Sequence, residues 1–387
     1  MDSLTTLATL SLHRIGEHGL LLDPSRGRLY ALNPCATFIW SQLKEGASPD
    51  RAQRALIEHF ALPAETAASY VRDVLQQYAS LDGADDGATA KVQPVQPTRP
   101  APPVAAAALA CCSLLGSHFR LRFDDRRLLE IANPLLRHLG STNRSGAKDA
   151  IDIAITRAGD DVLVVVNQQV IGETDGLDTA APLLRACLTQ IAVTRSAALC
   201  AIHAGALYRN GATLLLPGEA GHGKSTLSAG LASCGFEMLC DDTALLMGAP
   251  LHVRSLPTGL CVKRGAYPVL EQCYPQLLSL PEWRRPDGQW ARYLLPDRDI
   301  RWADGDRGAA VRWIVFPRYR PDASTTLAPL ARHEALARLL RGVYFLSGKL
   351  DERNLQKLVA WIEPIDCYEL VLSSLDEATA VLDELCA

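Results

Sequence analysis

The pattern of hydrophobic and polar positions changes along the chain and divides it into three parts. In residues 1–81, two short apolar runs at 19–23 and 28–32 are followed by three amphipathic segments, which predicts a hairpin and three helices. From residue 105 to 387, short apolar runs alternate with helical patterns, which predicts an α/β domain. The whole chain is then α/β in class, with an α+β organisation overall. Residues 82–104 between them carry five prolines and no apolar period, which predicts a linker.

Capping residues support the three helices of the first part. Asn33-Pro34 and Ser48-Pro49 each place a good N-cap before a proline suited to the first helical turn, and a third helix is predicted from Ala64 to Leu81. A hairpin followed by three helices is a small winged-helix arrangement.

In the third part, strand-like apolar runs alternate with helical patterns as far as the last helix. Strands are predicted at 119–123, 151–155, 162–166, 236–240, 251–256, 313–319 and 368–372. Helices are predicted at 182–199, 227–234, 333–346, 352–362 and from 376.

Composition and charge then exclude several classes of function. The chain has 48% hydrophobic and 21% charged residues and a net charge of −4, an ordinary globular balance. Winged helices often bind DNA, but residues 1–81 carry 7 Lys and Arg against 8 Asp and Glu, a poor match for a phosphate backbone. The apolar run 104–115 is too short to span a bilayer, so neither a nucleic acid nor a membrane is expected as a partner.

The cysteines indicate a reducing compartment. There are 11, an odd number, with no C-x-x-C pair spaced for zinc and no signal peptide before them. Reduced thiols and a cytoplasmic location are therefore expected.

The strongest motif lies between a predicted strand at 212–216 and a predicted helix from Leu227. It satisfies the phosphate-loop pattern G-x-x-x-x-G-K-[ST], in which backbone N–H groups and a helix N-terminus surround phosphate oxygens. The alternative is a glycine-rich turn that only caps a helix. The motif predicts an ATP site with Mg²⁺, formed by Gly218, Glu219, Ala220, Gly221, His222, Gly223, Lys224, Ser225 and Thr226.

Three further polar residues are candidates for the same site. Asp241 and Asp242 end a predicted strand 17 and 18 residues after Lys224, and a parallel return would bring them beside the first strand, near the phosphates. By themselves such acids can cap a helix or solvate a turn. His203 lies 21 residues before Lys224 among apolar residues, where a histidine is more often a core group than a catalyst.

Together these segments resemble the core of HPr serine kinase/phosphorylase, a family related in fold to PEP carboxykinase. The similarity is carried by His203-Ala-Gly, the loop 218–226 and Cys240-Asp241-Asp242 at these separations. Those kinases transfer the γ-phosphoryl group of ATP to a serine hydroxyl. The resemblance implies that Lys224 grips phosphates, that Ser225 and Asp241 serve Mg²⁺, that Asp242 takes the hydroxyl proton, and that His203 lies beside the transferring phosphate.

The chain departs from that family downstream of the acids. Where the family has Glu-x-Arg-Gly, this chain has Val262-Lys263-Arg264-Gly265, which puts a second metal ligand and phosphorylase activity in question. Lys263 and Arg264 are candidates for contacts with phosphate or substrate. Surface solvation is the alternative for both.

Residues 10–82 resemble the PqqD-like family, the peptide-recognition domains of ribosomal peptide modification systems. Leu20-Leu-Leu-Asp-Pro, Leu29-Tyr-Ala-Leu-Asn33 and Ala36-Thr-Phe-Ile-Trp40 carry the resemblance. It implies that the leader segment of a precursor peptide adds as a strand at the edge near 19–23 or 28–32 and packs on the third helix. The alternative is a domain that only covers the rest of the protein or supports a homo-oligomer.

We therefore predict an ATP- and Mg²⁺-dependent kinase that phosphorylates a hydroxyl, that of serine, on a ribosomally made precursor peptide. One alternative keeps the kinase and replaces the acceptor by a folded carrier protein or a small metabolite. Another is a non-catalytic, ATP-binding peptide chaperone. The retained acidic pair favours the kinase, because binding alone needs one metal ligand.

Overall fold

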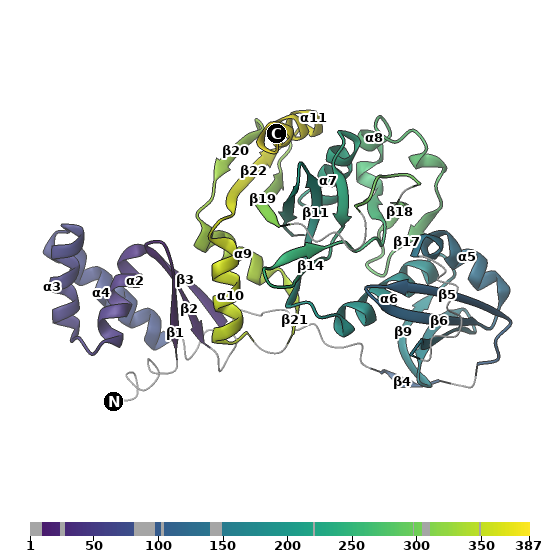
Figure 1. Cartoon of the computed structure of the whole chain (residues 1–387), viewed down its shortest axis with the longest axis horizontal. Helices are drawn as coiled ribbons and strands as arrows, with labels where there is room; N and C mark the ends of the chain where they lie inside the picture. Colours follow the sequence, from purple (N-terminus) through teal and green to yellow (C-terminus); the bar gives the residue numbers. More distant parts are fainter. Residues whose placement is uncertain are drawn as a thin grey trace. The chain divides into compact units, whose positions relative to one another are not determined.

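The computed structural model describes residues 10–23, 28–80, 97–101, 104–139, 149–219, 221–296, 298–303, 310–347 and 350–387 (Figure 1). These residues have a mixed α/β structure that groups into two compact units. Unit 1 comprises Met1–Lys91 and Pro329–Tyr368, and unit 2 comprises Val92–Ala328 and Glu369–Ala387. The segment 329–368, expected within the C-terminal domain, thus groups with the N-terminal part of the chain.

Unit 1 contains an antiparallel sheet in the order β1 (Ser11–Ile15), β2 (His18–Asp23), β3 (Arg28–Leu32). The apolar pattern missed β1, whose sequence Ser-Leu-His-Arg-Ile is largely polar. Because β2 pairs with β1 on one side and with β3 on the other, the open edge predicted at 19–23 is wrong. In the described sheet, the outer edges belong to β1 and β3.

One face of this sheet packs on the predicted helices, which are α2 (Pro34–Lys44), α3 (Pro49–Phe60) and α4 (Ala64–Ser80). The predicted caps are present: Asn33 Oδ1 accepts from the Ala36 N–H at 2.8 Å, and Ser48 Oγ accepts from the Arg51 N–H at 3.3 Å. Leu21 and Trp40 are both fully buried between the sheet and α2.

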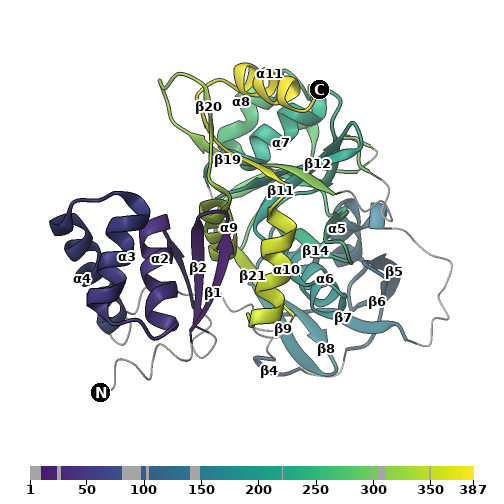
Figure 2. The same cartoon turned by 60° about the vertical axis from the view of Figure 1, so that its left-hand side comes forward.

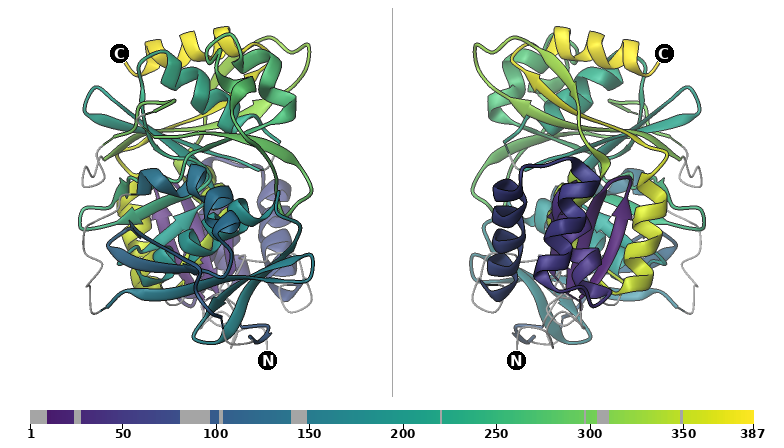
Figure 3. Two further views of the ribbon diagram at one scale, coloured as in Figure 1. Left: turned by 90° about the vertical axis from the view of Figure 1, so that its right-hand side faces the viewer. Right: turned by 90° about the vertical axis from the view of Figure 1, so that its left-hand side faces the viewer.

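The opposite face is covered by α9 (Arg332–Arg341) and α10 (Glu352–Ile362). The right panel of Figure 3 shows α10, in yellow, beside the purple strands. The imidazoles of His18 and His333 stack there with centroids 3.6 Å apart. Leu20, Leu21 and Leu22 are all 0% exposed, although successive strand residues point to opposite faces. The continuous leucine run, rather than an alternating one, therefore reflects a sheet buried on both faces.

The helix predicted at 333–346 is shorter than expected. It ends at Arg341, Gly342 follows as the C-cap residue, and Val343–Leu346 is strand β21. Valine, tyrosine and phenylalanine after a glycine favour a strand over a continued helix.

Unit 2 is built around a six-stranded sheet that carries the phosphate-loop segment. Its order is β13 (Glu237–Cys240), β11 (Ala204–Arg209), β12 (Ala212–Pro217), β19 (Val311–Tyr319), β22 (Asp366–Leu372) and β20 (Thr326–Pro329). Helices α7 (Lys224–Ser233) and α11 (Leu375–Leu385) lie together on one side of it (Figure 2). A Cβ at Gly205 of β11 would lie 2.8 Å from Ser228 Oγ of α7, so glycine is needed there for the helix to approach the strand.

Three other sheets complete unit 2. The strands β15 (His252–Arg254), β14 (Ala244–Met247) and β10 (Cys200–Ile202) lie in that order, and β16 (Leu260–Lys263), β18 (Trp290–Leu294) and β17 (Glu282–Arg284) form another sheet. The last sheet has the order β4 (Arg99–Pro100), β9 (Gln169–Asp175), β8 (Asp161–Val166), β7 (Ile151–Ala158), β6 (Ser117–Phe123) and β5 (Ala108–Leu114). Helices α5 (Arg126–Leu136) and α6 (Ala180–Arg195) also belong to unit 2.

Part of the predicted linker is ordered. Thr98 N–H donates to Val170 O and Ala101 N–H donates to Gln168 O, both at 2.9 Å, so Arg99–Pro100 pairs with the edge of β9. Of the linker predicted at 82–104, residues 82–96 and 102–103 lie outside the described residues.

Because α9 and α10 cover the second face of the three-stranded sheet, a substitution at Leu20 should destabilise that sheet. Leu20→Ala should destabilise unit 1 by about 2–5 kcal/mol, because it removes a buried side chain between β2 and these helices. Hydrogen exchange of the β2 amides in the full chain measures this as lost protection. Leu109→Ala, at a side chain that is 63% exposed, is the matched control and should change little. Unchanged β2 protection in Leu20→Ala would contradict a covered second face.

Candidate functional site

The candidate residues gather at one edge of the central sheet of unit 2 because of how its strands run. β11 is antiparallel to β12 and also to β13. The start of β11, the end of β12 and the end of β13 therefore lie at the same edge, and these positions carry His203, the loop from Gly218 and Asp241. The predicted parallel return beside β12 is wrong in detail, since β11 lies between β12 and β13.

The loop after β12 leads into the N-terminus of α7. Gly221 and Gly223 adopt φ values of +88° and +85°, where a side chain would be strained. Gly223 is the N-cap of α7 and no side chain caps this helix, so its first N–H groups remain available to an anion. Ala220 lies outside the described residues. Of the other predicted loop positions, His222 and Thr226 are half-buried.

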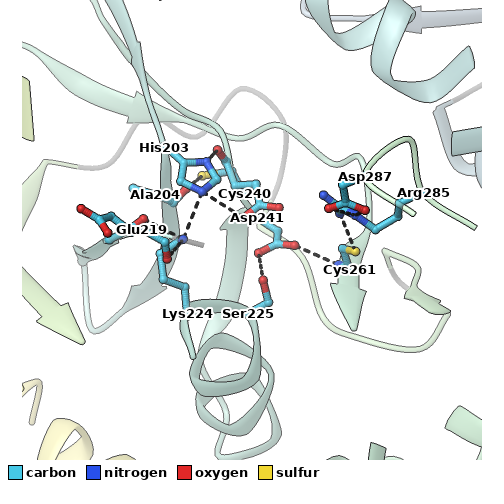
Figure 4. Close-up of polar contacts among 12 residues, drawn as sticks. His203, Ala204, Glu219, Lys224, Ser225, Cys240, Asp241, Cys261, Arg285 and Asp287 are labelled. Carbon is cyan, nitrogen blue, oxygen red and sulfur yellow. Dashed lines mark hydrogen bonds and ion pairs between the residues drawn. The ribbon is translucent and has the colours of Figure 1, made fainter. Parts of the chain in front are cut away.

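Lys224 is 5% exposed, and its ammonium is fully hydrogen-bonded (Figure 4). Nζ lies 2.7 Å from Gly218 O, 3.0 Å from Glu219 O and 3.1 Å from His203 Nε2. Both carbonyls can only accept, so Nζ donates to each of them. Burial lowers the pKa of Lys224, while Asp242 and Asp241 raise it.

His203 is neutral in this arrangement. The Asp242 carbonyl oxygen, 3.1 Å from Nδ1, can only accept, so the proton of the neutral ring sits on Nδ1 and Nε2 accepts from Lys224. Burial and then the Lys224 charge lower the pKa of His203, and Asp242 opposes them. The 3.9 Å approach of Nε2 to Asp242 Oδ1 is therefore not a charged pair.

Asp241 is the most deeply buried acid of the site, at 2% exposure. Oδ1 accepts from the Ser225 hydroxyl at 3.0 Å, and Oδ2 accepts from the Cys261 N–H at 2.8 Å. Burial, followed by the neighbouring Asp242 carboxylate, raises the pKa of Asp241 to about 7, although both hydrogen bonds act in the opposite direction. The carboxylate thus joins α7, β13 and β16 at one point.

Asp242 differs from its neighbour in conformation and exposure. Its φ is +61°, a left-handed value that is uncommon for a residue other than glycine. Its side chain is 34% exposed, and its backbone carbonyl holds His203. Strained backbone of this kind is frequent at functional sites, and here it leaves one carboxylate of the pair open to solvent.

Arg185 of α6 supports the site and was missed by the sequence analysis. Its Nε donates to Thr258 O at 2.6 Å and its Nη2 to Gly259 O at 3.2 Å, which fixes the turn that leads into β16. Its charge also lowers the pKa of Asp241. A single arginine within a helical pattern carries no sequence signal for this role.

Lys263 and Arg264, the two predicted phosphate contacts, are in different surroundings. Arg264 donates twice to Glu282, at 2.8 and 2.7 Å, and lies over the Trp290 ring at 4.9 Å. Lys263 makes no hydrogen bond or ion pair with the described residues, and its charge lowers the pKa of both His203 and Lys224. Of these two cationic side chains, Lys263 is therefore the one whose charge acts on His203 and Lys224.

A divalent cation fits two of these side chains. The Ser225 hydroxyl and an Asp241 carboxylate oxygen, 3.0 Å apart, are oxygen ligands of the kind that Mg²⁺ prefers. In the described part of the chain, no group of three or more His, Cys, Asp and Glu side chains is placed to hold a metal. This agrees with Mg²⁺ sites in which one or two protein groups act together with substrate phosphates.

Two wider observations concern the whole chain. All 11 cysteines are free. Among the described helices, none combines the length and the apolar character needed to cross a bilayer.

Comparison with known proteins identifies the N-terminal part. Residues 19–82 match the model of the family described as "Coenzyme PQQ synthesis protein D (PqqD)", so this stretch is a PqqD-like domain. No curated protein matches the chain. Among solved structures, the Hpr(Ser) kinase/phosphatase from Coxiella burnetii matches with 13% identity and a TM-score of 0.23, over 48% of this chain and 95% of that one.

The raised pKa of Asp241 predicts a pH-dependent stability. A carboxyl whose pKa rises from 3.8 to about 7 on folding stabilises the fold below pH about 4 and loses this contribution as pH rises to about 7. Relative to Asp241→Asn, the wild-type protein should therefore lose up to about 4 kcal/mol of unfolding free energy over this range. Urea unfolding without Mg²⁺ at several pH values measures the difference. A difference that does not vary with pH would contradict the raised pKa.

Proposed function

We propose that this protein is an ATP- and Mg²⁺-dependent kinase that phosphorylates a hydroxyl group, that of serine, on a precursor peptide recruited by its PqqD-like domain. The observation that carries the proposal is the pairing of a buried carboxylate, Asp241, with an open one, Asp242, beside the glycine loop and Lys224. The free thiols support a cytoplasmic setting.

The loop and Lys224 would bind the triphosphate. The uncapped N-terminus of α7 offers backbone N–H groups and the positive end of the helix dipole. The Lys224 ammonium, now on the Gly218 and Glu219 carbonyls, would exchange these neutral acceptors for charged phosphate oxygens. Charge-assisted hydrogen bonds are stronger than neutral ones, so this exchange favours binding.

Ser225 and Asp241 would hold Mg²⁺. When bound, Mg²⁺ neutralises charge on the transferring phosphate. The two hydrogen bonds to Asp241 orient its carboxylate before the metal arrives. Burial keeps water away from the same oxygens, which strengthens their interaction with a cation.

Asp242 would act as the general base. As the acceptor oxygen bonds to the γ-phosphorus of ATP, the bond from that phosphorus to the β–γ bridging oxygen breaks and ADP leaves. The hydroxyl proton goes to the exposed Asp242 carboxylate. Neutral His203 fixes the Asp242 backbone through its Nδ1–H and contacts Lys224 through Nε2, so it positions both groups.

The PqqD-like domain would supply the peptide. In the described sheet of unit 1, β3 presents an outer edge and its residue Ala31 is exposed. An extended leader would add there as a fourth strand through backbone hydrogen bonds, with α4 as the neighbouring surface. Because the acceptor hydroxyl is then tethered, the kinase site needs little affinity of its own for the peptide.

Replacing the proposed base tests the chemistry. Asp242→Asn should lower turnover about 10²- to 10⁴-fold while leaving ATP affinity nearly unchanged, because the amide keeps the shape but cannot take the proton. Mass spectrometry of peptide incubated with ATP and Mg²⁺ measures the transferred phosphate. Asp322→Asn is the matched control, since Asp322 has the same φ of +61° on an exposed turn. Full phosphorylation by Asp242→Asn would refute this role, and no phosphate transfer by the wild type would favour a chaperone.

Deleting the leader tests the recruitment. A precursor peptide without its leader should be phosphorylated with a kcat/KM reduced about 10²-fold or more, because the tethering is lost. Adding the free leader should inhibit the intact peptide and leave the truncated one unaffected. Equal rates for both peptides would instead indicate a folded carrier protein or a small metabolite as the acceptor.

A further inference from the structure

The strand order gives a bound nucleotide a direction. β12, which leads into the phosphate loop, lies between β11 and β19. His203, Asp241 and Asp242 all belong to the side of β11 and β13. If the terminal phosphate meets these groups, the base must extend away from them, and the strand on the other side of β12 is β19.

The end of β19 lies against the loop. β19 runs parallel to β12, so its carboxyl end is at the loop edge of the sheet. A Cβ placed on Gly218 would lie 3.8 Å from Pro317 O. A Cβ placed on Gly223 would lie 3.6 Å from Tyr319 Cβ. Tyr319 therefore starts beside Gly223, the N-cap residue of α7.

Tyr319 is also unusually open for an aromatic side chain. It is 50% exposed and is one of five large apolar side chains that are exposed in the described part of the chain. Within the described residues, no hydrogen bond or ring contact holds its phenol ring. An exposed ring next to an anion-binding loop is typical of a stacking surface for a nucleobase, since every base has a π-face.

We propose that Tyr319 is the stacking platform for the base of the nucleotide whose phosphates occupy the 218–226 loop. This inference rests on the proposed nucleotide function and adds the residue that recognises the base. The platform lies about one strand spacing from β12, while the acids lie on the opposite side of that strand.

The same geometry limits the specificity that Tyr319 confers. Stacking distinguishes a nucleotide from a bare polyphosphate, but it discriminates weakly among bases. Along a strand, alternate side chains point to opposite faces, so the exposed Arg318 of β19 faces away from the ring. Tyr319 should thus support purine nucleotides as a class, ATP and GTP alike.

Binding measurements with two probes test the proposal. Tyr319→Ala should weaken ATP and GTP about ten- to a hundredfold and leave inorganic tripolyphosphate unchanged, while Tyr319→Phe should bind all three like the wild type. Leu109→Ala, at the 63% exposed leucine of β5, is the control for losing an exposed apolar side chain and should bind all three normally. Isothermal titration calorimetry with Mg²⁺ gives each affinity, and far-UV circular dichroism confirms folding.

The outcomes separate this proposal from the one on which it rests. If the wild type binds neither ATP nor tripolyphosphate, the nucleotide site itself is refuted. If Tyr319→Ala loses ATP and tripolyphosphate equally, the residue only supports the loop and the platform is refuted. If its ATP affinity equals that of the wild type, the base lies elsewhere and the platform is likewise refuted.

Discussion

The hydrogen bonds of one buried carboxylate hold the candidate site together. Asp241 receives the Ser225 hydroxyl from α7 and the Cys261 N–H from β16 while it follows β13 itself. A buried charge is costly unless such partners stabilise it. Burial raises the pKa of Asp241, so the ionised carboxylate is destabilised in the folded chain in the absence of a cation.

The residues around Asp241 differ from it in exposure and protonation. Asp242 follows directly in the chain, but its left-handed backbone turns it to a more open position. Lys224 and His203 lock each other's protonation, since an ammonium that donates to Nε2 requires a neutral imidazole. Two adjacent acids therefore acquire different environments, and this difference is the physical basis for the separate roles proposed for them.

Unit 1 shows a second constraint, the need to cover both faces of a small sheet. A three-stranded sheet with one helical layer would leave Leu20 and Leu22 in water. The segment 329–368 supplies the second layer, so the PqqD-like domain is completed by residues that lie more than 240 positions further along the chain. This arrangement ties the PqqD-like domain to the same chain segment that joins β20 to β22.

The sequence alone determined what depends on neighbouring residues: the helices capped by Asn33 and Ser48, the glycine loop with Lys224, and the acidic pair after a buried strand. It missed β1, placed β13 beside β12, and gave no hint of Arg185 or of the layer formed by α9 and α10. Those features depend on pairing and packing between distant segments, which local periodicity does not encode. The tertiary structure alone decided which strand edges stay open, which aspartate is buried, and that Tyr319 lies beside the loop.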